Sequence, residues 1–390
     1  MKKKRIKENR SLAPAMSLVL TSTLLLSLLL PDRSFSATEN RSLARSASVS
    51  FPALEDGTTG QELNTWFADQ FPGRNLFFHL NYLVRKSTGQ KEIKGVFLGK
   101  GALLANPEAE KNDNVSATII ALNHFASLSG LPCYVMVSPS AATIQPHKLP
   151  FDAPVRDVTP TLNTLAMRLK DPVNVDAQMP LTEHNQEYIF YRTDHHWTSK
   201  GAGQAAKALL AAMDIQIDLN EFEMMPVSRN FQGTLASKTG SVGLKDTIEL
   251  SVSKHNPNYL VTWADGTKTS SIYNKAALDT KDKYQVFLGA NQAKICIDTD
   301  ADSSRSLLLF KDSYANSMVQ YLLPYFSSIT IVDPRYYDQD LDLVMSSDLF
   351  TDIAFVYSYD TFATISSLKD LLNDWNTAHS AASDPEPGGE

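Results

Sequence analysis

Apolar runs and amphipathic runs alternate along most of the chain, and the alternation is clearest in the last third. Apolar runs bounded by polar residues predict buried strands, and apolar positions at helical spacing predict the helices between them. The predicted strands include 134–137, 306–310, 329–332 and 353–357. The predicted helices include 114–128, 158–170, 314–323, 339–345 and 362–375. Strands that alternate with helices form a parallel sheet covered on both faces, so the pattern predicts an α/β fold.

The middle third of the chain has a different pattern. Strand-like runs flank Asp265-Gly266, which is typical of a hairpin, and two further runs at 284–288 and 293–297 flank a second turn. We therefore predict a β-rich insertion over residues 215–300 within a larger domain that covers residues 58–380.

The amino terminus predicts export. Six Lys or Arg residues within 1–10 precede an apolar run over 12–30, and small residues follow at Ser34 and Ser36. This is the layout of a signal peptide over residues 1–36. The apolar run is also near the roughly 20 residues that span a bilayer, so an uncleaved membrane anchor is the alternative. In either case the basic end stays inside, and the remainder is expected outside the cytoplasm.

Two further segments are predicted to lie outside the domain. Residues 37–57 are rich in Ser, Thr and Arg with little periodicity and are typical of a linker, and the composition of residues 381–390 predicts a disordered tail. The two cysteines, Cys133 and Cys296, each lie in an apolar run. A disulfide and two buried free thiols are both compatible with that setting.

Charge excludes one class of partner. The 390 residues carry a formal net charge of −7, and without residues 1–36 the chain has 29 basic and 41 acidic residues, a net charge of −12. Nucleic-acid binding requires a basic face for the phosphates, so we expect no nucleic-acid partner.

A candidate nucleophile follows a buried strand. The apolar run 306–310 leads through Lys311 and Asp312 to Ser313, and a helical pattern begins at once. This arrangement places Ser313 at the carboxyl edge of a parallel sheet, where α/β proteins bind ligands. Amides at the start of the predicted helix would stabilise an oxyanion there. Ordinary capping of the helix by Asp312 or Ser313 is the structural alternative.

A candidate acid–base pair lies in the segment 191–201. Asp194 and His196 are two residues apart behind a predicted strand at 186–191, and on an extended segment they would point the same way. A carboxylate that orients an imidazole prepares it as a general base for a serine from another segment. His195 would point the other way and is expected to be structural or a secondary contact.

A metal site is the competing use of Asp194-His195-His196. Zinc needs three or four ligands, and the remaining histidines are scattered without a ligand-like spacing. DHH-type phosphoesterases share only this tripeptide, and the other Asp motifs they need are absent. We therefore expect neither a metal nor a cofactor.

Two segments together carry a family resemblance: Tyr191-Arg-Thr-Asp-His-His-Trp-Thr-Ser-Lys-Gly-Ala202 and Lys311-Asp-Ser-Tyr-Ala-Asn-Ser317. They resemble the bacterial DHHW family, which is similar to the alginate O-acetyltransferases of the SGNH-hydrolase superfamily. Shorter similar stretches lie at 231–235, 287–291 and 333–337. The resemblance implies an SGNH-hydrolase-like fold and a triad of Asp194, His196 and Ser313, in the chain order that the alginate enzymes have.

The resemblance also has departures. Lys311 stands where many SGNH enzymes have glycine before Asp-Ser. Asn291 resembles the residue that supplies a second oxyanion donor, although a turn residue is the alternative. Arg335 follows a strand end and is a candidate for substrate binding or for a surface salt bridge. Together with Tyr314 and His195, these two residues complete the predicted substrate-binding set.

The favoured function is acyl transfer outside the cytoplasm, with O-acetylation of a cell-envelope or secreted polysaccharide through an acyl-serine. The resemblance implies a partner as well, a membrane-bound O-acyltransferase that supplies acetyl groups. Two alternatives remain: an esterase in which water is the acceptor for the same triad, and a polysaccharide-binding or assembly protein without activity. Acceptor choice depends on the shape of the site and on water exclusion, which a sequence does not reveal.

Overall fold

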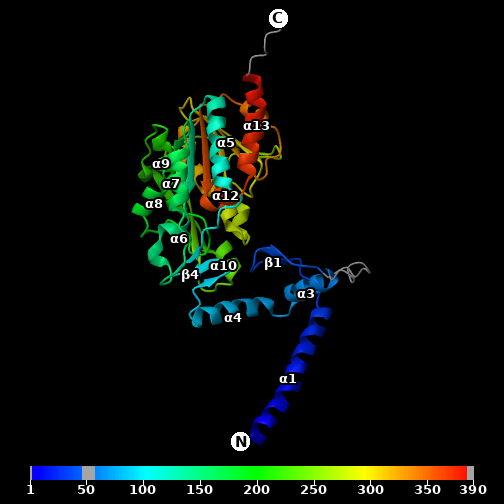
Figure 1. Cartoon of the computed structure of the whole chain (residues 1–390). Helices are drawn as coiled ribbons and strands as arrows, with labels where there is room; N and C mark the ends of the chain where they lie inside the picture. Colours follow the sequence, from blue (N-terminus) through cyan, green and yellow to red (C-terminus); the bar gives the residue numbers. More distant parts are fainter. Residues whose placement is uncertain (1, 46–57, 384–390) are drawn as a thin grey trace. The chain divides into compact units, whose positions relative to one another are not determined.

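The computed structural model describes residues 2–45 and 58–383 (Figure 1). The chain divides into two compact units, one formed by residues 1–90 with 237–242 and the other by residues 91–236 with 243–390. Among the residues that the structure describes, no helix is both long enough and apolar enough to cross a membrane.

The N-terminal unit contains three long helices and a small hairpin. Their bounds are α1 (Lys2–Leu29), β1 (Phe35–Ser36), β2 (Arg41–Ser42), α3 (Thr58–Gln70) and α4 (Arg74–Ser87). Residues 37–45, the described part of the predicted linker, pair in this hairpin and bind α3 and α4 through side chains. The remainder of that linker, 46–57, lies outside the described residues, as does the predicted tail from 384 onward. Residues 381–383 of the predicted tail are helical instead, because the last helix of the chain continues to Ser383.

The second unit is built on an eight-stranded sheet with the order β11-β10-β12-β14-β13-β15-β6-β7. The strands from β14 to β7 are parallel, and β12, β10 and β11 continue the sheet in antiparallel fashion. Their bounds are β6 (Cys133–Ser138), β7 (Val173–Asn174), β10 (Tyr259–Thr262), β11 (Lys268–Thr269), β12 (Lys294–Thr299), β13 (Ser306–Lys311), β14 (Ser328–Val332) and β15 (Asp352–Ser358). The predicted α/β architecture is confirmed.

Successive side chains along each central strand point to opposite faces of the sheet, so they pack into two separate cores. On β13, Leu307 and Leu309 belong to one core with helix α9 (Ser199–Ala212), whereas Leu308 and Phe310 belong to the other. That second core includes α5 (Asn114–Ser129) and α13 (Ser367–Ser383), which lie side by side in Figure 1. Both faces are covered, which is why these strands are mainly apolar along their length.

The remaining elements connect or flank the sheet. They are β3 (Glu92–Ile93), β4 (Val96–Leu98), β5 (Leu103–Ala105), β8 (Phe222–Phe231), β9 (Asp246–Ser253), and the helices α6 (Ala141–Ile144), α7 (Thr159–Arg168), α8 (Gln178–Glu183), α10 (Thr234–Thr239), α11 (Asp342–Met345) and α12 (Tyr359–Thr364). The segment 215–300 is divided between two roles: β8 and β9 pair with each other, whereas β10, β11 and β12 extend the main sheet.

Four local predictions differ from the structure. The predicted helix at 362–375 is divided into α12 and α13, which are separated by residues 365–366. The predicted strand at 186–191 is a loop with one isolated bridge between Phe190 and Trp197, and the predicted strand at 284–288 is largely the 3-10 helix η4 (Lys283–Val286). The predicted helix at 314–323 is three short 3-10 helices, η5 (Ser313–Ser317), η6 (Val319–Tyr321) and η7 (Leu323–Tyr325).

The interruption of the helix after Ser313 has an identifiable cause. The carbonyl of Ser313 accepts a hydrogen bond from the Tyr284 hydroxyl at 3.0 Å, and the carbonyl of Tyr314 accepts one from the Trp197 indole at 2.9 Å. An α-helix would direct these two carbonyls at amides four residues on. Side chains from distant segments bind them here, and the chain closes tighter i to i+3 turns. The dipole of a long helix is therefore not available to Ser313, which corrects the sequence-based expectation.

Candidate functional site

The carboxyl ends of three neighbouring strands meet around Ser313. It follows β13, which lies between β14 and β15. Asp312 caps the 3-10 helix by accepting the Tyr314 amide at 2.9 Å. The other oxygen of Asp312 accepts the Ser358 amide at 2.9 Å and the Ser358 hydroxyl at 2.6 Å. The capping role thus belongs to Asp312, and it leaves the half-buried Ser313 hydroxyl free to face another segment.

That other segment is the loop that contains Asp194. The buried carboxylate of Asp246 fixes its start, because it accepts the Arg192 amide at 2.8 Å and the Thr193 amide at 2.8 Å. Fully buried Trp197 fixes its end through the indole hydrogen bonds to Tyr314 and to the Ser317 hydroxyl. The loop is therefore held from one side by β9 and from the other by the segment that begins with Ser313.

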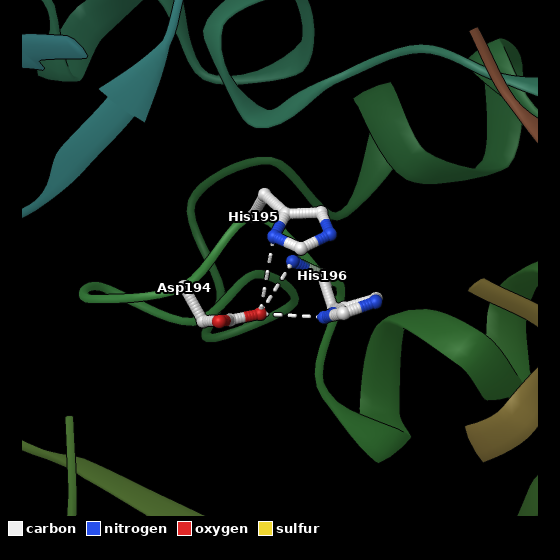
Figure 2. Close-up of side chains that lie close together, drawn as sticks. All are labelled: Asp194, His195 and His196. Carbon is white, nitrogen blue, oxygen red and sulfur yellow. Dashed lines mark hydrogen bonds and ion pairs between the residues drawn. The ribbon is translucent and has the colours of Figure 1, made fainter. Parts of the chain in front are cut away.

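A continuous hydrogen-bonded chain joins the two segments. The Asp194 Oδ1 atom lies 2.5 Å from His196 Nδ1, and His196 Nε2 lies 2.8 Å from the Ser313 hydroxyl. Figure 2 shows the Asp194 carboxylate facing the His196 ring. Asp194 also accepts the His196 amide at 3.0 Å, so the two residues are brought together by a bend of the backbone rather than by an extended segment.

The second oxygen of the Asp194 carboxylate is held by α10. It accepts the Thr234 amide at 2.8 Å and the Thr234 hydroxyl at 3.0 Å. Gly233 precedes this threonine, and a Cβ atom there would lie 2.2 Å from Asp194 Oδ2. Glycine is required at this position because the carboxylate occupies the space of a side chain. With both oxygens bound, the carboxylate has one orientation towards His196.

Electrostatics sets the protonation states that such a relay needs. Burial alone would raise the pKa of Asp194, but His195, His196 and the hydrogen bonds to the carboxylate outweigh it, and the pKa is lowered from its ordinary value. Burial and the nearby His195 lower the pKa of His196 to about 4, against the opposing effect of Asp194. At neutral pH the carboxylate is ionised and the imidazole is neutral. With Nδ1–H donated to Asp194, Nε2 is left to accept the serine proton.

His195 occupies a different environment. Its side chain is 39% exposed, its ring lies against that of His196 with centroids 3.9 Å apart, and its Nδ1 atom lies 2.8 Å from the Thr234 hydroxyl. Since that hydroxyl donates to Asp194, it accepts from His195. The imidazole therefore supports the carboxylate indirectly, through the Thr234 hydroxyl.

The metal alternative has a geometric basis as well. One ligand atom from each of Asp194, His195 and His196 lies within 4.8 Å of the others. Among residues 2–45 and 58–383, these three form the group that could hold an ion. Yet Nδ1 and Nε2 of His196, both Asp194 oxygens and His195 Nδ1 already have protein partners. An ion would have to displace these hydrogen bonds, so the donor set fits the relay better than a metal.

Two tyrosines enclose the His196 ring and its loop. The Tyr284 ring stacks on the imidazole with centroids 3.8 Å apart and an interplanar angle of 8°. Burial raises the pKa of Tyr284, so the hydroxyl stays protonated and donates to the Ser313 carbonyl. Tyr314, a predicted substrate-binding residue, is buried and donates its hydroxyl to the His195 carbonyl at 2.6 Å. Its position supports the loop.

The other two predicted substrate-binding residues belong to a polar network behind Ser313. Buried Lys311 donates to Asp333 at 3.1 Å and to Asn291 at 3.3 Å. Asp333 also accepts both the Nε and Nη2 atoms of Arg335, at 2.8 and 2.7 Å. The lysine that replaces the expected glycine is thus an anchor for the turn that contains Asn291. Arg335 is committed to an ion pair, although its side chain is 22% exposed.

Several residues of the site were missed by the sequence analysis, chiefly Asp246, Thr234 and Tyr284. A usable signal existed for Gly233-Thr234 alone, since both lie in the 231–235 stretch that carries the resemblance.

The structure also decides between the two alternatives for the cysteines. Cys133 and Cys296 are both free thiols.

The sheet, the loop and the strand-end serine define a class of protein, the SGNH-hydrolase-like α/β proteins. Residues 97–289 match the family model described as "SGNH hydrolase-like domain, acetyltransferase AlgX". Over these residues the chain is similar to that family, and the predicted resemblance is confirmed. Among curated protein sequences, none matches the chain.

Solved structures agree on the fold. A DHHW family protein from Eubacterium siraeum is similar with a TM-score of 0.61 and 23% identity, over 72% of this chain and 98% of that protein. Bacillus cereus PatB1 with a sulfonyl adduct is similar with a TM-score of 0.59 and 20% identity, over 70% of this chain and 99% of PatB1. At these identities the likeness establishes the shared architecture.

Proposed function

We propose that this protein is a serine O-acyltransferase that acetylates hydroxyl groups of a cell-envelope or secreted polysaccharide. The observation that carries the proposal is the relay from Asp194 through His196 to Ser313, with distances of 2.5 and 2.8 Å. The match to an acetyltransferase family model over 97–289 supports the acyl group, and the glycan acceptor follows from the resemblance to the alginate enzymes.

In the first half-reaction, the Ser313 hydroxyl attacks the carbonyl carbon of an acyl donor while its proton passes to His196 Nε2. The tetrahedral intermediate collapses, the bond to the donor's leaving group breaks, and His196 returns the proton to that group. Asp194 stabilises the imidazolium through the Nδ1 hydrogen bond. The product of this half-reaction is an acyl-serine at the carboxyl end of β13.

In the second half-reaction, an acceptor hydroxyl gives its proton to His196 as its oxygen attacks the acyl-serine. The ester bond to Ser313 breaks, and the serine oxygen recovers the proton from His196. With a sugar hydroxyl the product is an acetylated glycan, and with water it is acetate. The two outcomes use the same residues, so an esterase is the second candidate.

We further propose that the protein acts outside the cytoplasm, next to a membrane-bound O-acyltransferase that supplies acetyl groups. The basic and apolar layout of residues 1–30 supports the location. This segment would be either cleaved as a signal peptide or kept as an anchor, and the contacts of the residues after α1 favour the uncleaved form. Asp32 accepts the Trp66 indole at 3.0 Å, and the Arg33 amide donates to Gln70 at 3.0 Å. Cleavage after Ser36 would remove both contacts and cut the β1–β2 hairpin.

The test uses a chromogenic acetyl ester with and without acetyl-free oligosaccharide, and it follows ester turnover and product mass. Ser313→Ala is expected to reduce turnover by about 10³-fold or more, since the remaining groups give only residual catalysis. A sulfonyl fluoride is expected to label Ser313 and to spare the Ser313→Ala variant. The matched control is Ser346→Ala, which removes an exposed hydroxyl that lies outside the site and has no contact with the relay.

Unchanged turnover in Ser313→Ala would contradict the proposal. Acetate as the sole product in the presence of several glycans would favour the esterase. Loss of turnover after treatment with a chelator, restored by zinc, would favour the metal alternative at Asp194, His195 and His196.

A further inference from the structure

Helix α4 in the N-terminal unit exposes a continuous apolar face. Leu76, Phe77, Leu80, Leu83 and Val84 are 42% to 61% exposed, and their spacing places them on one side of the helix. Phe77 contacts the ring of Phe71, with centroids 5.4 Å apart, and still remains 56% exposed. Scattered apolar residues on a surface need no explanation, but a stripe of five along one helix marks a surface that binds something.

The opposite side of α4 is already packed. Tyr82 is buried, Phe78 and His79 are half-buried, and His79 Nδ1 lies 2.8 Å from the carbonyl of Gly240 in the segment 237–242 of the same unit. The helix thus has one apolar face that stabilises its own unit and a second that faces outward. The second face cannot be explained by the core of this unit.

The charges of α4 indicate the partner. The helix contains Arg74, Arg85 and Lys86 and no acidic residue. Arg74 pairs with Glu39, whereas Arg85 and Lys86 lie in the last turn, where Arg85 binds Asn81 at 3.0 Å and Lys86 lies 5.7 Å from the centre of the Tyr82 ring. A helix with one exposed apolar face and only basic charges is typical of helices that lie in the interface of an anionic bilayer.

A second observation points to lipid independently. The described part of α1 and the residue after it expose ten large apolar side chains, among them Met16, Leu20 and Leu30. The chain that leaves this helix is bound to α3 through Asp32 and Arg33, and to the first turn of α4 through the ion pair of Glu39 with Arg74 at 2.6 Å. The exposed apolar surfaces of α1 and α4 are therefore joined by a segment that hydrogen bonds and an ion pair hold in place.

We propose that the face of α4 formed by Leu76, Phe77, Leu80, Leu83 and Val84 docks on the surface of an anionic lipid bilayer. The helix lies along the interface with this face in the acyl region, while Arg85 and Lys86 contact the lipid headgroups. This docking does not depend on the proposed acyl transfer, because no residue of the relay takes part in it.

The experiment uses the full chain reconstituted into vesicles of phosphatidylcholine and phosphatidylglycerol. A bimane fluorophore is attached at Leu80→Cys, and the matched control carries it at Asn81→Cys, an exposed polar position on the next residue. Both variants also contain Cys296→Ser, and Cys133 is buried. Quenching by lipids with a nitroxide on the acyl chain is compared with quenching by aqueous iodide.

Docking predicts that lipid nitroxides quench the probe at position 80 about twofold more than the probe at 81, with the reverse order for iodide, because an interfacial helix buries only its apolar side. Arg85→Glu combined with Lys86→Glu is expected to reduce the lipid quenching at position 80. Equal quenching at the two positions would overturn the proposal. A probe at position 80 that is shielded from both quenchers would overturn it too, because a second copy or another protein would then cover the face.

Discussion

The two units of this protein differ in how completely they bury their apolar side chains. The second unit, residues 91–236 with 243–390, covers both faces of its sheet, and core side chains such as Phe310 and Phe355 are fully buried. The N-terminal unit leaves apolar side chains of α1 and α4 exposed and stabilises its ordered loop with ion pairs. The two parts of the chain also differ in charge. Residues 1–90 carry 12 basic and 7 acidic residues, a net charge of +5, whereas residues 91–390 carry 24 basic and 36 acidic residues, a net charge of −12.

The difference fits the two proposals, in which one unit acts on an acyl group and the other binds a lipid surface. A unit that satisfies its own core presents polar groups around a precise relay, which suits a small reacting group. A unit with open apolar faces and an excess of basic residues suits a lipid surface. Changes in one unit should therefore leave the function of the other unit intact.

The largest effect is expected from Asp194→Asn. An amide in place of the carboxylate favours the wrong His196 tautomer, in which Nε2 is protonated and cannot accept the serine proton. Turnover of an acetyl ester should fall by about 10³- to 10⁴-fold while the circular dichroism spectrum stays unchanged. The control is Asp374→Asn, at an exposed position on α13, which should retain full turnover. Equal activity of the two variants would remove Asp194 from the relay.

Gly233→Ala should have the next largest effect. The new Cβ atom would meet the Asp194 carboxylate at 2.2 Å and shift it, and small misplacements of this kind cost about 10²-fold in rate. Gly60→Ala is the matched control in the N-terminal unit, because a Cβ there has nothing within 4 Å. Turnover should fall only in the first variant. Wild-type kinetics in Gly233→Ala would show that the contact is not needed for orientation.

The pH profile should reveal the buried imidazole. The pKa of His196 is lowered to about 4, below the ordinary value, so the neutral base persists well into the acidic range. Turnover should be flat from neutral pH downward and reach half its maximum at about pH 4. The depressed pKa also means that the contribution of His196 to stability is complete above its unfolded pKa of about 6.5 and is lost as the pH falls towards 4.

Circular dichroism at each pH separates that loss of stability from protonation of the base. A half-maximal pH near 6.5 in a fully folded protein would contradict the lowered pKa of His196 and the burial that causes it.

The smallest effect on turnover is expected from Asp69→Ala in the N-terminal unit. The buried carboxylate accepts two guanidinium nitrogens of Arg41 and the Ala44 amide, and the loss of these hydrogen bonds should cost about 1–3 kcal/mol. Hydrogen exchange should accelerate in α3, while ester turnover stays at the wild-type level. Glu62→Ala, at an exposed position of the same helix, serves as the control. A parallel loss of turnover would show that the units are coupled.

The sequence was most informative where one physical pattern dominates. Mainly apolar runs identified the central strands, because a sheet covered on both faces buries nearly all of its side chains. Asp194, His196 and Ser313 could be selected because their chemistry is rare and their segments were distinctive. The helix after Ser313 and the strand before Asp194 were predicted wrongly, since hydrogen bonds from distant side chains override local propensity at both places.

What the sequence determined by itself is the class of sheet, the candidate relay and the apolar, basic character of the amino terminus, because periodicity and composition are local properties. What only the tertiary structure decided is which atoms meet. The 2.8 Å contact between His196 and Ser313 spans 117 positions, and the supports from Thr234, Asp246 and Tyr284 come from three further segments. Such contacts depend on how the chain returns to the edge of its sheet, which no local pattern encodes.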